Sequence, residues 1–165
     1  MSDNDTKDVV IERTFDAPVS RVWQAWTDPE QMMRWWGPKD FTAPTIQMDF
    51  RVGGKYLFCM RGSIGPDAPA QDFWSTGTYE EIVPEERLVY TDSFADAVGN
   101  VVSPATYGMP DMPEKLRVTV EFVATEDGKT KMTLTHTGAP AGENADNMLV
   151  GWNQSFDKLA QSVVV

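Results

Sequence analysis

The sequence has one cysteine, Cys59, and one histidine, His136. A single cysteine excludes a disulfide within the chain, and this pair is too few for a zinc site built from several Cys and His ligands. There is also no G-x-S-x-G nucleophile elbow, no G-x-G-x-x-G after a strand and no P-loop. These absences argue against hydrolases with a Ser-His-Asp site, nucleotide-binding enzymes and zinc enzymes. Cys59 lies in the apolar stretch LFCMR, which favours a small buried side chain over a reactive thiol.

Positive charge is also scarce, with 14 Lys and Arg against 25 Asp and Glu, a net charge of −11. A surface this acidic repels phosphate backbones and anionic membranes, so we expect no nucleic-acid partner. No apolar run approaches the ~18 residues of a membrane span, so we expect no membrane insertion. The first residues, MSDNDTKD, lack the apolar core of a signal peptide. These features predict an acidic cytoplasmic protein.

The 165 residues contain no internal repeat and no linker that would divide them. We therefore predict a flexible N-terminal tail at residues 1–8 and a single domain at residues 9–165. Branched and aromatic residues predict a first strand at residues 9–15. A helix should follow Pro18, and a second short helix should begin after an N-cap at Asp28 and end at Gly37-Pro38.

Further along the chain, apolar residues alternate with polar ones, which predicts antiparallel strands. The expected strands cover residues 45–52, 55–61, 73–83, 87–94, 116–124 and 130–137. From about Asn144, the apolar period changes to that of an amphipathic helix, which continues to the C-terminal end. This order predicts an α+β fold in which a curved antiparallel sheet of about six or seven strands wraps around the last helix, with two short helices after the first strand.

Large apolar side chains are plentiful, since the chain has 6 Trp, 8 Phe, 4 Tyr and 9 Met. Such side chains fill cores and also line adaptable pockets. Trp35 and Trp36 are adjacent, so they point about 100° apart on a helix, and we expect Trp36 in the core and Trp35 at a cavity. The loop at residues 95–114, rich in Pro and Met, is either a lid over that cavity or a solvated insertion.

His136 should share the inward face of its strand with Met132 and Leu134. It is either a histidine satisfied by backbone or water near the sheet edge, or a polar anchor or proton carrier in a cavity wall. In the second case it needs an acidic or phenolic neighbour, for which the sequence offers Tyr79, Glu80, Glu81 and Tyr90.

Four stretches carry a family resemblance in the same order along the chain: RTFDAPVSRVWQAWTDPEQMMRWWG, MDFRVGGKY, GTYEEIVPEERLVYTDSF and GWNQSFDKLA. Together they resemble the START-like, or SRPBCC, superfamily, and within it the heat-shock protein ATPase activator homologues. The resemblance covers nearly the whole chain. It implies a helix-grip fold, in which the terminal helix lies across the concave face of the sheet and a cavity often opens between them. It also implies binding of lipids, polyketides or hormones in some relatives, catalysis of cyclisation in others, and chaperone binding in the namesake.

Our leading hypothesis is a binding protein for a small apolar or amphipathic molecule in a cavity between sheet and terminal helix. One alternative is a cyclase or dehydratase that uses His136 with a Tyr or Glu. Another is a chaperone-interaction module linked to the stress response, and a homodimer contact is also possible. We expect no metal and no cofactor. The candidate ligand-binding residues, each of which could instead be core, are Trp35, Phe58, Met60, Trp74, Tyr90, His136, Met148, Trp152 and Phe156.

Overall fold

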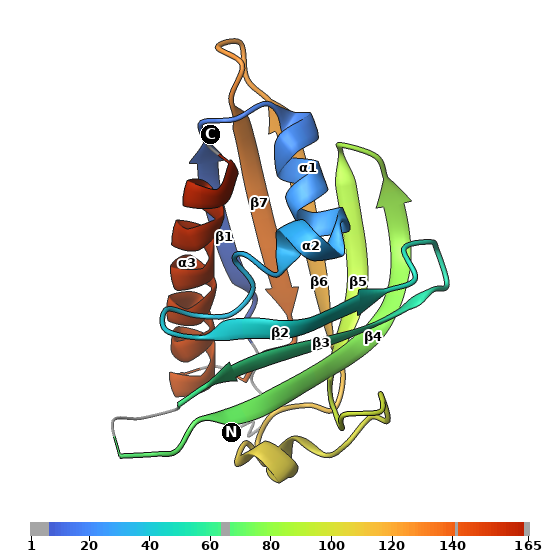
Figure 1. Ribbon diagram of the computed structural model, residues 1–165, viewed down its shortest axis with the longest axis vertical. Coiled ribbons are helices and arrows are strands. Elements are labelled where there is room, and N and C mark those ends of the chain that lie inside the picture. The colour runs from blue at the N-terminus through green and yellow to red at the C-terminus, as the bar shows by residue number, and fades with distance from the viewer. Residues whose placement is uncertain (1–6, 64–66, 141, 164–165) are drawn as a thin grey trace.

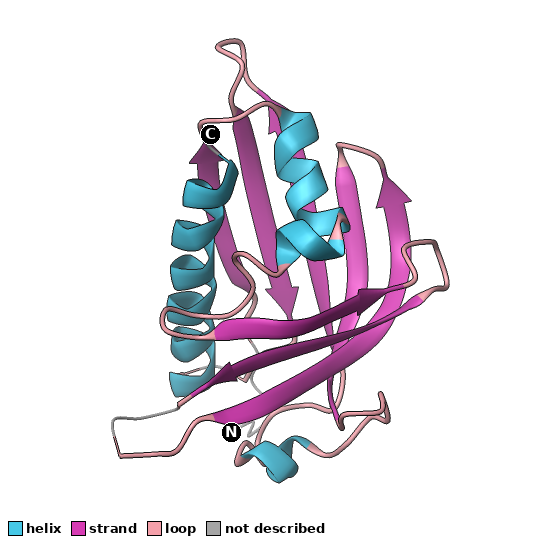
Figure 2. Cartoon of the chain, viewed as in Figure 1, coloured by secondary structure: helices cyan, strands magenta, loops and turns pink. Residues whose placement is uncertain are grey.

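The computed structural model describes residues 7–63, 67–140 and 142–163, with the side chains of residues 143 and 144 left out. One antiparallel sheet of seven strands, in the order β1-β7-β6-β5-β4-β3-β2, curls around the C-terminal helix (Figure 1). Two short helices pack inside the curl, and a loop with one turn of 3-10 helix lies at one end of the molecule (Figure 2). The predicted α+β helix-grip architecture is confirmed.

The elements follow each other as the sequence predicts. Their bounds are β1 Val9–Phe15, α1 Val19–Thr27, α2 Pro29–Met32, β2 Thr42–Met48, β3 Lys55–Gly62, β4 Gln71–Val83, β5 Arg87–Ala95, η1 Pro104–Tyr107, β6 Leu116–Ala124, β7 Thr130–Thr137 and α3 Glu143–Val163. Most of the predicted N-terminal tail lies outside the described residues. At its inner end, the Lys7 amide donates to the Ala139 carbonyl over 2.8 Å.

The predicted N-cap of the second short helix is confirmed. The carboxylate of Asp28 accepts the Glu30 amide at 3.0 Å and the Gln31 side-chain amide at 3.2 Å. This satisfies a free N–H at the start of the helix. However, α2 ends at Met32 rather than at Gly37-Pro38, because the chain passes into a turn.

The predicted strand at residues 45–52 was wrong at its end, since β2 stops at Met48. The alternation of apolar residues runs on into a turn, where the Gly54 amide donates to the Arg51 carbonyl over 2.8 Å. A Cβ added at Gly54 would lie 2.0 Å from the Asp49 carbonyl oxygen. The close approach of the backbone at this turn therefore requires glycine, and it ends the strand despite the continuing pattern.

The concave face of the sheet holds the core. On this face, Met132 and Leu134 of β7 are fully buried together with Phe156 and Leu159 of α3. The indole N–H of Trp26 donates to the Met132 sulfur over 3.3 Å, so the tryptophan packs with its polar atom satisfied. The C-terminal half of α3 is thus held between the sheet and α1.

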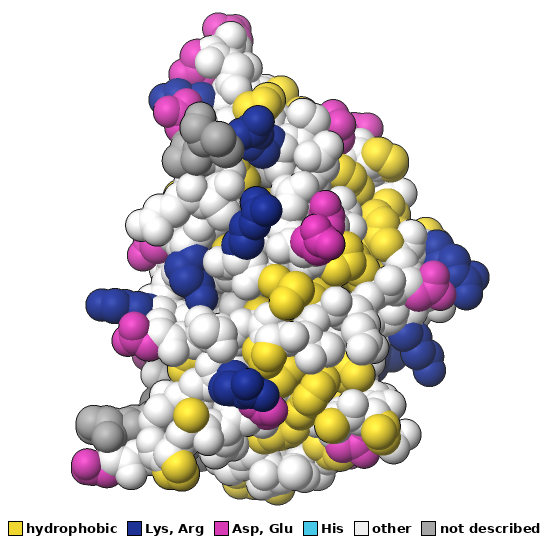
Figure 3. Space-filling model, in the orientation of Figure 1, with side chains coloured by type: hydrophobic (Ala, Val, Ile, Leu, Met, Phe, Trp, Pro, Cys, Tyr) yellow, Lys and Arg dark blue, Asp and Glu magenta, His cyan; other side chains and the backbone are white. Residues whose placement is uncertain are grey.

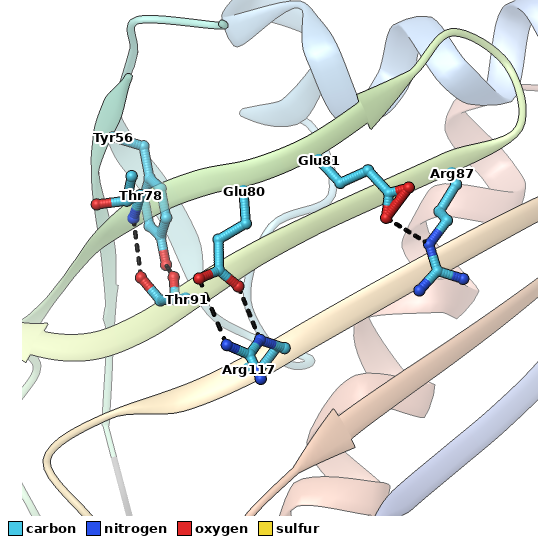
Figure 4. Close-up of polar contacts among 7 residues, drawn as sticks. All are labelled: Tyr56, Thr78, Glu80, Glu81, Arg87, Thr91 and Arg117. Atoms are coloured by element: carbon cyan, nitrogen blue, oxygen red, sulfur yellow. Dashed lines mark hydrogen bonds and ion pairs between the residues drawn. The ribbon is translucent and has the colours of Figure 1, made fainter. Parts of the chain in front are cut away.

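On the solvent side, two of the acidic candidates named above pair with arginines (Figure 4). Arg117 of β6 reaches Glu80 of β4 at 2.7 Å, and Arg87 reaches Glu81 at 2.8 Å. An irregularity in the pairing of β4 with β5 falls between Tyr79 and Glu81, and both glutamates reach the solvent side there. Neither is placed to serve a group on the concave face. On the face seen in Figure 3, Lys and Arg side chains are scattered and form no broad basic area.

Candidate ligand pocket

A pocket of about 490 Å³ opens between the N-terminal half of α3 and the ends of β3, β4 and β5. Its volume is in the range of about 300–1,000 Å³ that is typical of small-molecule sites. From α3 it is lined by Asn147, Met148, Gly151, Trp152 and Ser155. These positions follow helical spacing, so they form one stripe of the helix. The pocket is therefore built by the same helix that closes the core further along.

The turn after α2 supplies another wall of the pocket. It also accommodates two adjacent tryptophans, Trp35 and Trp36, by directing them to different surroundings. Trp35 is fully buried, and its indole N–H donates to the Ala25 carbonyl over 2.9 Å. Trp36 lines the pocket and meets the Trp152 ring at 5.5 Å. The prediction had these roles reversed, because it assumed helical directions at residues that lie beyond the end of α2.

The structure sorts the remaining candidates into two groups. Five lie on the pocket wall: Met60, Trp74, His136, Met148 and Trp152. Phe58, Tyr90 and Phe156 do not line it, and each is at most 3% exposed. Phe58 stacks on Tyr56 with ring centres 4.2 Å apart, and Phe156 lies among other rings of the core. The apolar pattern placed Phe58 and Phe156 on inward faces, but it does not tell where along such a face the core ends and the pocket begins.

His136 lies on the inward face as predicted and is 5% exposed. The indole N–H of Trp152 donates to His136 Nδ1 over 3.1 Å. In the neutral imidazole Nδ1 is therefore the acceptor, and the proton belongs on Nε2. Nε2 is buried and makes no hydrogen bond among the described residues, but it lies 3.4 Å from Asp92 Oδ2.

Asp92 is the functional candidate that the sequence reasoning missed. It lies on β5, two residues beyond Tyr90, so the two side chains share the concave face. Tyr90 pairs with Val118, and Val118 pairs with His136, so the register of these three strands brings Asp92 beside the histidine. The acidic neighbour of His136 is thus Asp92, and not Glu80 or Glu81, which are on the solvent side.

Two tyrosines lie next to this carboxylate. The Tyr56 hydroxyl donates to the Thr91 carbonyl over 2.7 Å (Figure 4) and lies 3.4 Å from Asp92 Oδ1. The Tyr90 hydroxyl is buried and makes no hydrogen bond to the part of the chain that the structure describes. Burial, and then the charge of Asp92, raises the pKa of both phenols well above 10. Both tyrosines are therefore neutral at physiological pH.

The segment between β5 and β6 closes one end of the pocket. Gly108, Met109, Met112 and Pro113 contribute to the wall. Tyr107 anchors the segment, because its hydroxyl donates to the Ala95 carbonyl at 2.6 Å and its ring lies 5.1 Å from that of Phe94. The predicted loop is therefore part of the pocket in this structure, while its opening as a lid stays a prediction.

Other reactive groups lie outside the pocket. Cys59 is fully buried, as expected, and burial raises the pKa of its thiol to about 11. Within residues 7–63, 67–140 and 142–163, no three His, Cys, Asp or Glu side chains are grouped as a metal site would require. Among these residues there is also no helix long and apolar enough to cross a membrane.

These features define a class of protein, the helix-grip domain with a pocket under its terminal helix. The model of the family described as "Activator of Hsp90 ATPase homolog 1-like protein" matches residues 16–163. The chain therefore belongs to this family, as the sequence resemblance suggested. A search of curated proteins found no match to the chain.

Solved structures agree with this assignment. A protein from Chromobacterium violaceum is 28% identical, with a TM-score of 0.75 over 94% of this chain and 96% of that one. A protein from Arthrobacter aurescens is 26% identical, with a TM-score of 0.70 over 98% of this chain and 92% of that one. The AHSA1 protein from Silicibacter pomeroyi is 19% identical, with a TM-score of 0.71 over 94% of this chain and 96% of that one, which shows likeness of fold alone.

Proposed function

We propose that this protein binds a small apolar or amphipathic molecule in the pocket beneath the N-terminal half of α3. The observation that carries the proposal is the pocket itself, about 490 Å³ and lined largely by aromatic and methionine side chains. Ligand sites are usually concave and mostly apolar, with a few polar groups that orient the guest. Asp92, Ser75 and Ser93 are such groups here.

Binding is favoured over catalysis by the environment of His136. One ring nitrogen accepts the Trp152 N–H, and the other is buried beside Asp92. A general acid or base must come within hydrogen-bond reach of its substrate. His136 lines the pocket, but its two ring nitrogens are directed at Trp152 and Asp92 rather than left free for a substrate. Chaperone binding stays a prediction that rests on the family's description.

The test is a ligand screen by thermal unfolding, with fatty alcohols, flavonoids and aromatic polyketides as probes. A guest present at 100 times its dissociation constant should stabilise the protein by about 2.7 kcal/mol. The variant Gly151→Leu should place a side chain into the pocket from α3, since Gly151 lies on the wall and its Cβ position is 3.6 Å from Pro38.

The matched control is Gly151→Ala, which adds only a methyl group in ordinary contact with Pro38. We expect the alanine variant to keep the ligand-induced shift and the leucine variant to lose it. Both should unfold cooperatively without ligand. Failure of the whole panel to shift the wild-type melting temperature, or equal shifts in the leucine variant, would overturn the proposed site.

A further inference from the structure

The one carboxylate on the described pocket wall has no strong partner of its own. Asp92 lines the pocket with its side chain 27% exposed. Its nearest polar neighbours, the Tyr56 hydroxyl and His136 Nε2, both lie 3.4 Å away, which is long for hydrogen bonds to a charged group. Among the described residues, the ion pair with His136 is the only one that includes Asp92, and it is a true ion pair only if the imidazole is protonated.

No described Lys or Arg lines the pocket to neutralise this charge. A carboxylate offers about four acceptor positions, and removing it from water is costly unless these are used. A guest that covers this carboxylate must therefore offer it hydrogen bonds, and a cationic donor does so best.

The rest of the wall also suits a cation. Trp152 donates to His136, whose other ring nitrogen lies 3.4 Å from the carboxylate, and the Trp36 ring lies 5.5 Å from that of Trp152 at an angle of 82°. Two indoles thus line the same pocket as the carboxylate. Indole faces attract ammonium groups, and a neighbouring carboxylate adds charge complementarity. The net charge of −11 further favours entry of cations over anions.

We propose that the ligand is an organic cation, an ammonium group carried on an apolar body, with the ammonium at Asp92 and the apolar part among the aromatic side chains. This inference rests on the proposed function, because it names the chemical class of the guest in the same pocket. In this proposal, Asp92 selects the ligand by its charge. The indole rings of Trp36 and Trp152 surround the ammonium end of the ligand.

The test uses three probes with the same ring system and different charge at pH 7: 1-naphthylmethylamine, 1-naphthylmethanol and 1-naphthoic acid. Isothermal titration calorimetry would measure their affinities for the full chain. We expect the amine to bind about tenfold more tightly than the alcohol, which is the gain from one well-placed charge-assisted contact. The acid should bind most weakly, because its carboxylate faces that of Asp92.

Asp92→Asn keeps the shape of the side chain and removes the charge, so the amine should lose its advantage over the alcohol. Asp157→Asn is the matched control, since Asp157 is exposed on α3 and pairs with Arg13 outside the pocket. It changes the net charge equally and should leave the preference for the amine intact. Thermal unfolding of both variants would show whether they are folded.

The outcomes separate the two proposals. If the alcohol or the acid binds wild-type protein as tightly as the amine, the cation inference is overturned and the pocket stands. The same holds if the amine fails to bind while neutral probes of the earlier panel do. If none of the probes binds and Gly151→Leu behaves as wild type, the proposed function fails, and this inference fails with it.

Discussion

The two halves of α3 differ although they belong to one continuous helix. In the C-terminal half, Phe156, Leu159 and Val163 are at most 2% exposed and fill the space under the sheet. In the N-terminal half, Met148 and Trp152 are only partly buried and face a pocket. The same amphipathic pattern therefore produces solid packing at one end and a ligand-sized space at the other.

The difference follows from side-chain size on the inward stripe. The packed half presents a phenylalanine and a leucine, whereas the pocket half presents Gly151 between Met148 and Trp152, and Ser155 follows where the two halves meet. Small side chains on this stripe leave room between the helix and the sheet, and the pocket occupies that room. In this fold, a pocket is made by placing small residues on one stretch of the helix.

The largest effect is expected for truncation in the packed half. Phe156→Ala removes a fully buried ring that contacts Trp26 and Trp35 at centre distances of 6.2 Å. We expect the free energy of unfolding to fall by about 3–5 kcal/mol, as in other buried aromatic truncations. Urea denaturation followed by circular dichroism would measure it.

The paired variant is Met148→Ala in the pocket half. Its side chain is partly exposed and borders existing space, so its removal creates little new cavity. We expect a loss below about 1 kcal/mol, since surface and partly exposed changes are usually small. Equal losses at Phe156 and Met148 would mean that the two halves are packed alike, and the comparison would be wrong.

An intermediate effect is expected for the hydrogen bond between Trp152 of α3 and His136 of β7. Trp152→Phe keeps an aromatic ring but removes the N–H that donates to His136 Nδ1 over 3.1 Å. Leaving a buried acceptor without its donor should lower stability by about 1–2 kcal/mol. A double-mutant cycle with His136→Phe isolates this contact, and a coupling energy near zero would show that the hydrogen bond contributes nothing.

The smallest effect, and the only gain, is expected at Gly151. Alanine at this helical position reduces the flexibility of the unfolded chain and meets Pro38 only at 3.6 Å. Gly151→Ala should therefore raise the free energy of unfolding by about 0.5–1 kcal/mol. A decrease in the melting temperature would indicate that the pocket wall is tighter at Gly151 than the 3.6 Å contact implies.

Much of this architecture could be predicted, because the period of the apolar pattern is a local property of the chain. β6 and β7 alternate over their full length, and their predicted bounds, 116–124 and 130–137, are those observed. The pattern failed at β2, where a turn happens to continue the alternation. The Gly53-Gly54 pair marked that turn, but not the residue at which pairing stops.

The pocket could be predicted only in part. The faces of Met60, His136 and Trp152 follow from period and parity, so these residues were found. Trp36 and Asp92 were missed for a different reason. The direction of Trp36 depends on how the chain leaves α2, and the meeting of Asp92 with His136 depends on the register of three strands. Such long-range geometry is not encoded in any short window.

One further contact joins α3 to the opposite rim of the pocket. The ammonium of Lys158, on α3 beyond the pocket, donates to the carbonyls of Pro38 and Phe41 at 3.2 and 3.1 Å. Both carbonyls belong to the stretch after α2 that forms the opposite rim. A bulky guest that forces helix and rim apart must break these two charge-assisted bonds, whereas a slim one leaves them in place. We therefore expect these two bonds to resist widening of the pocket between α3 and the rim.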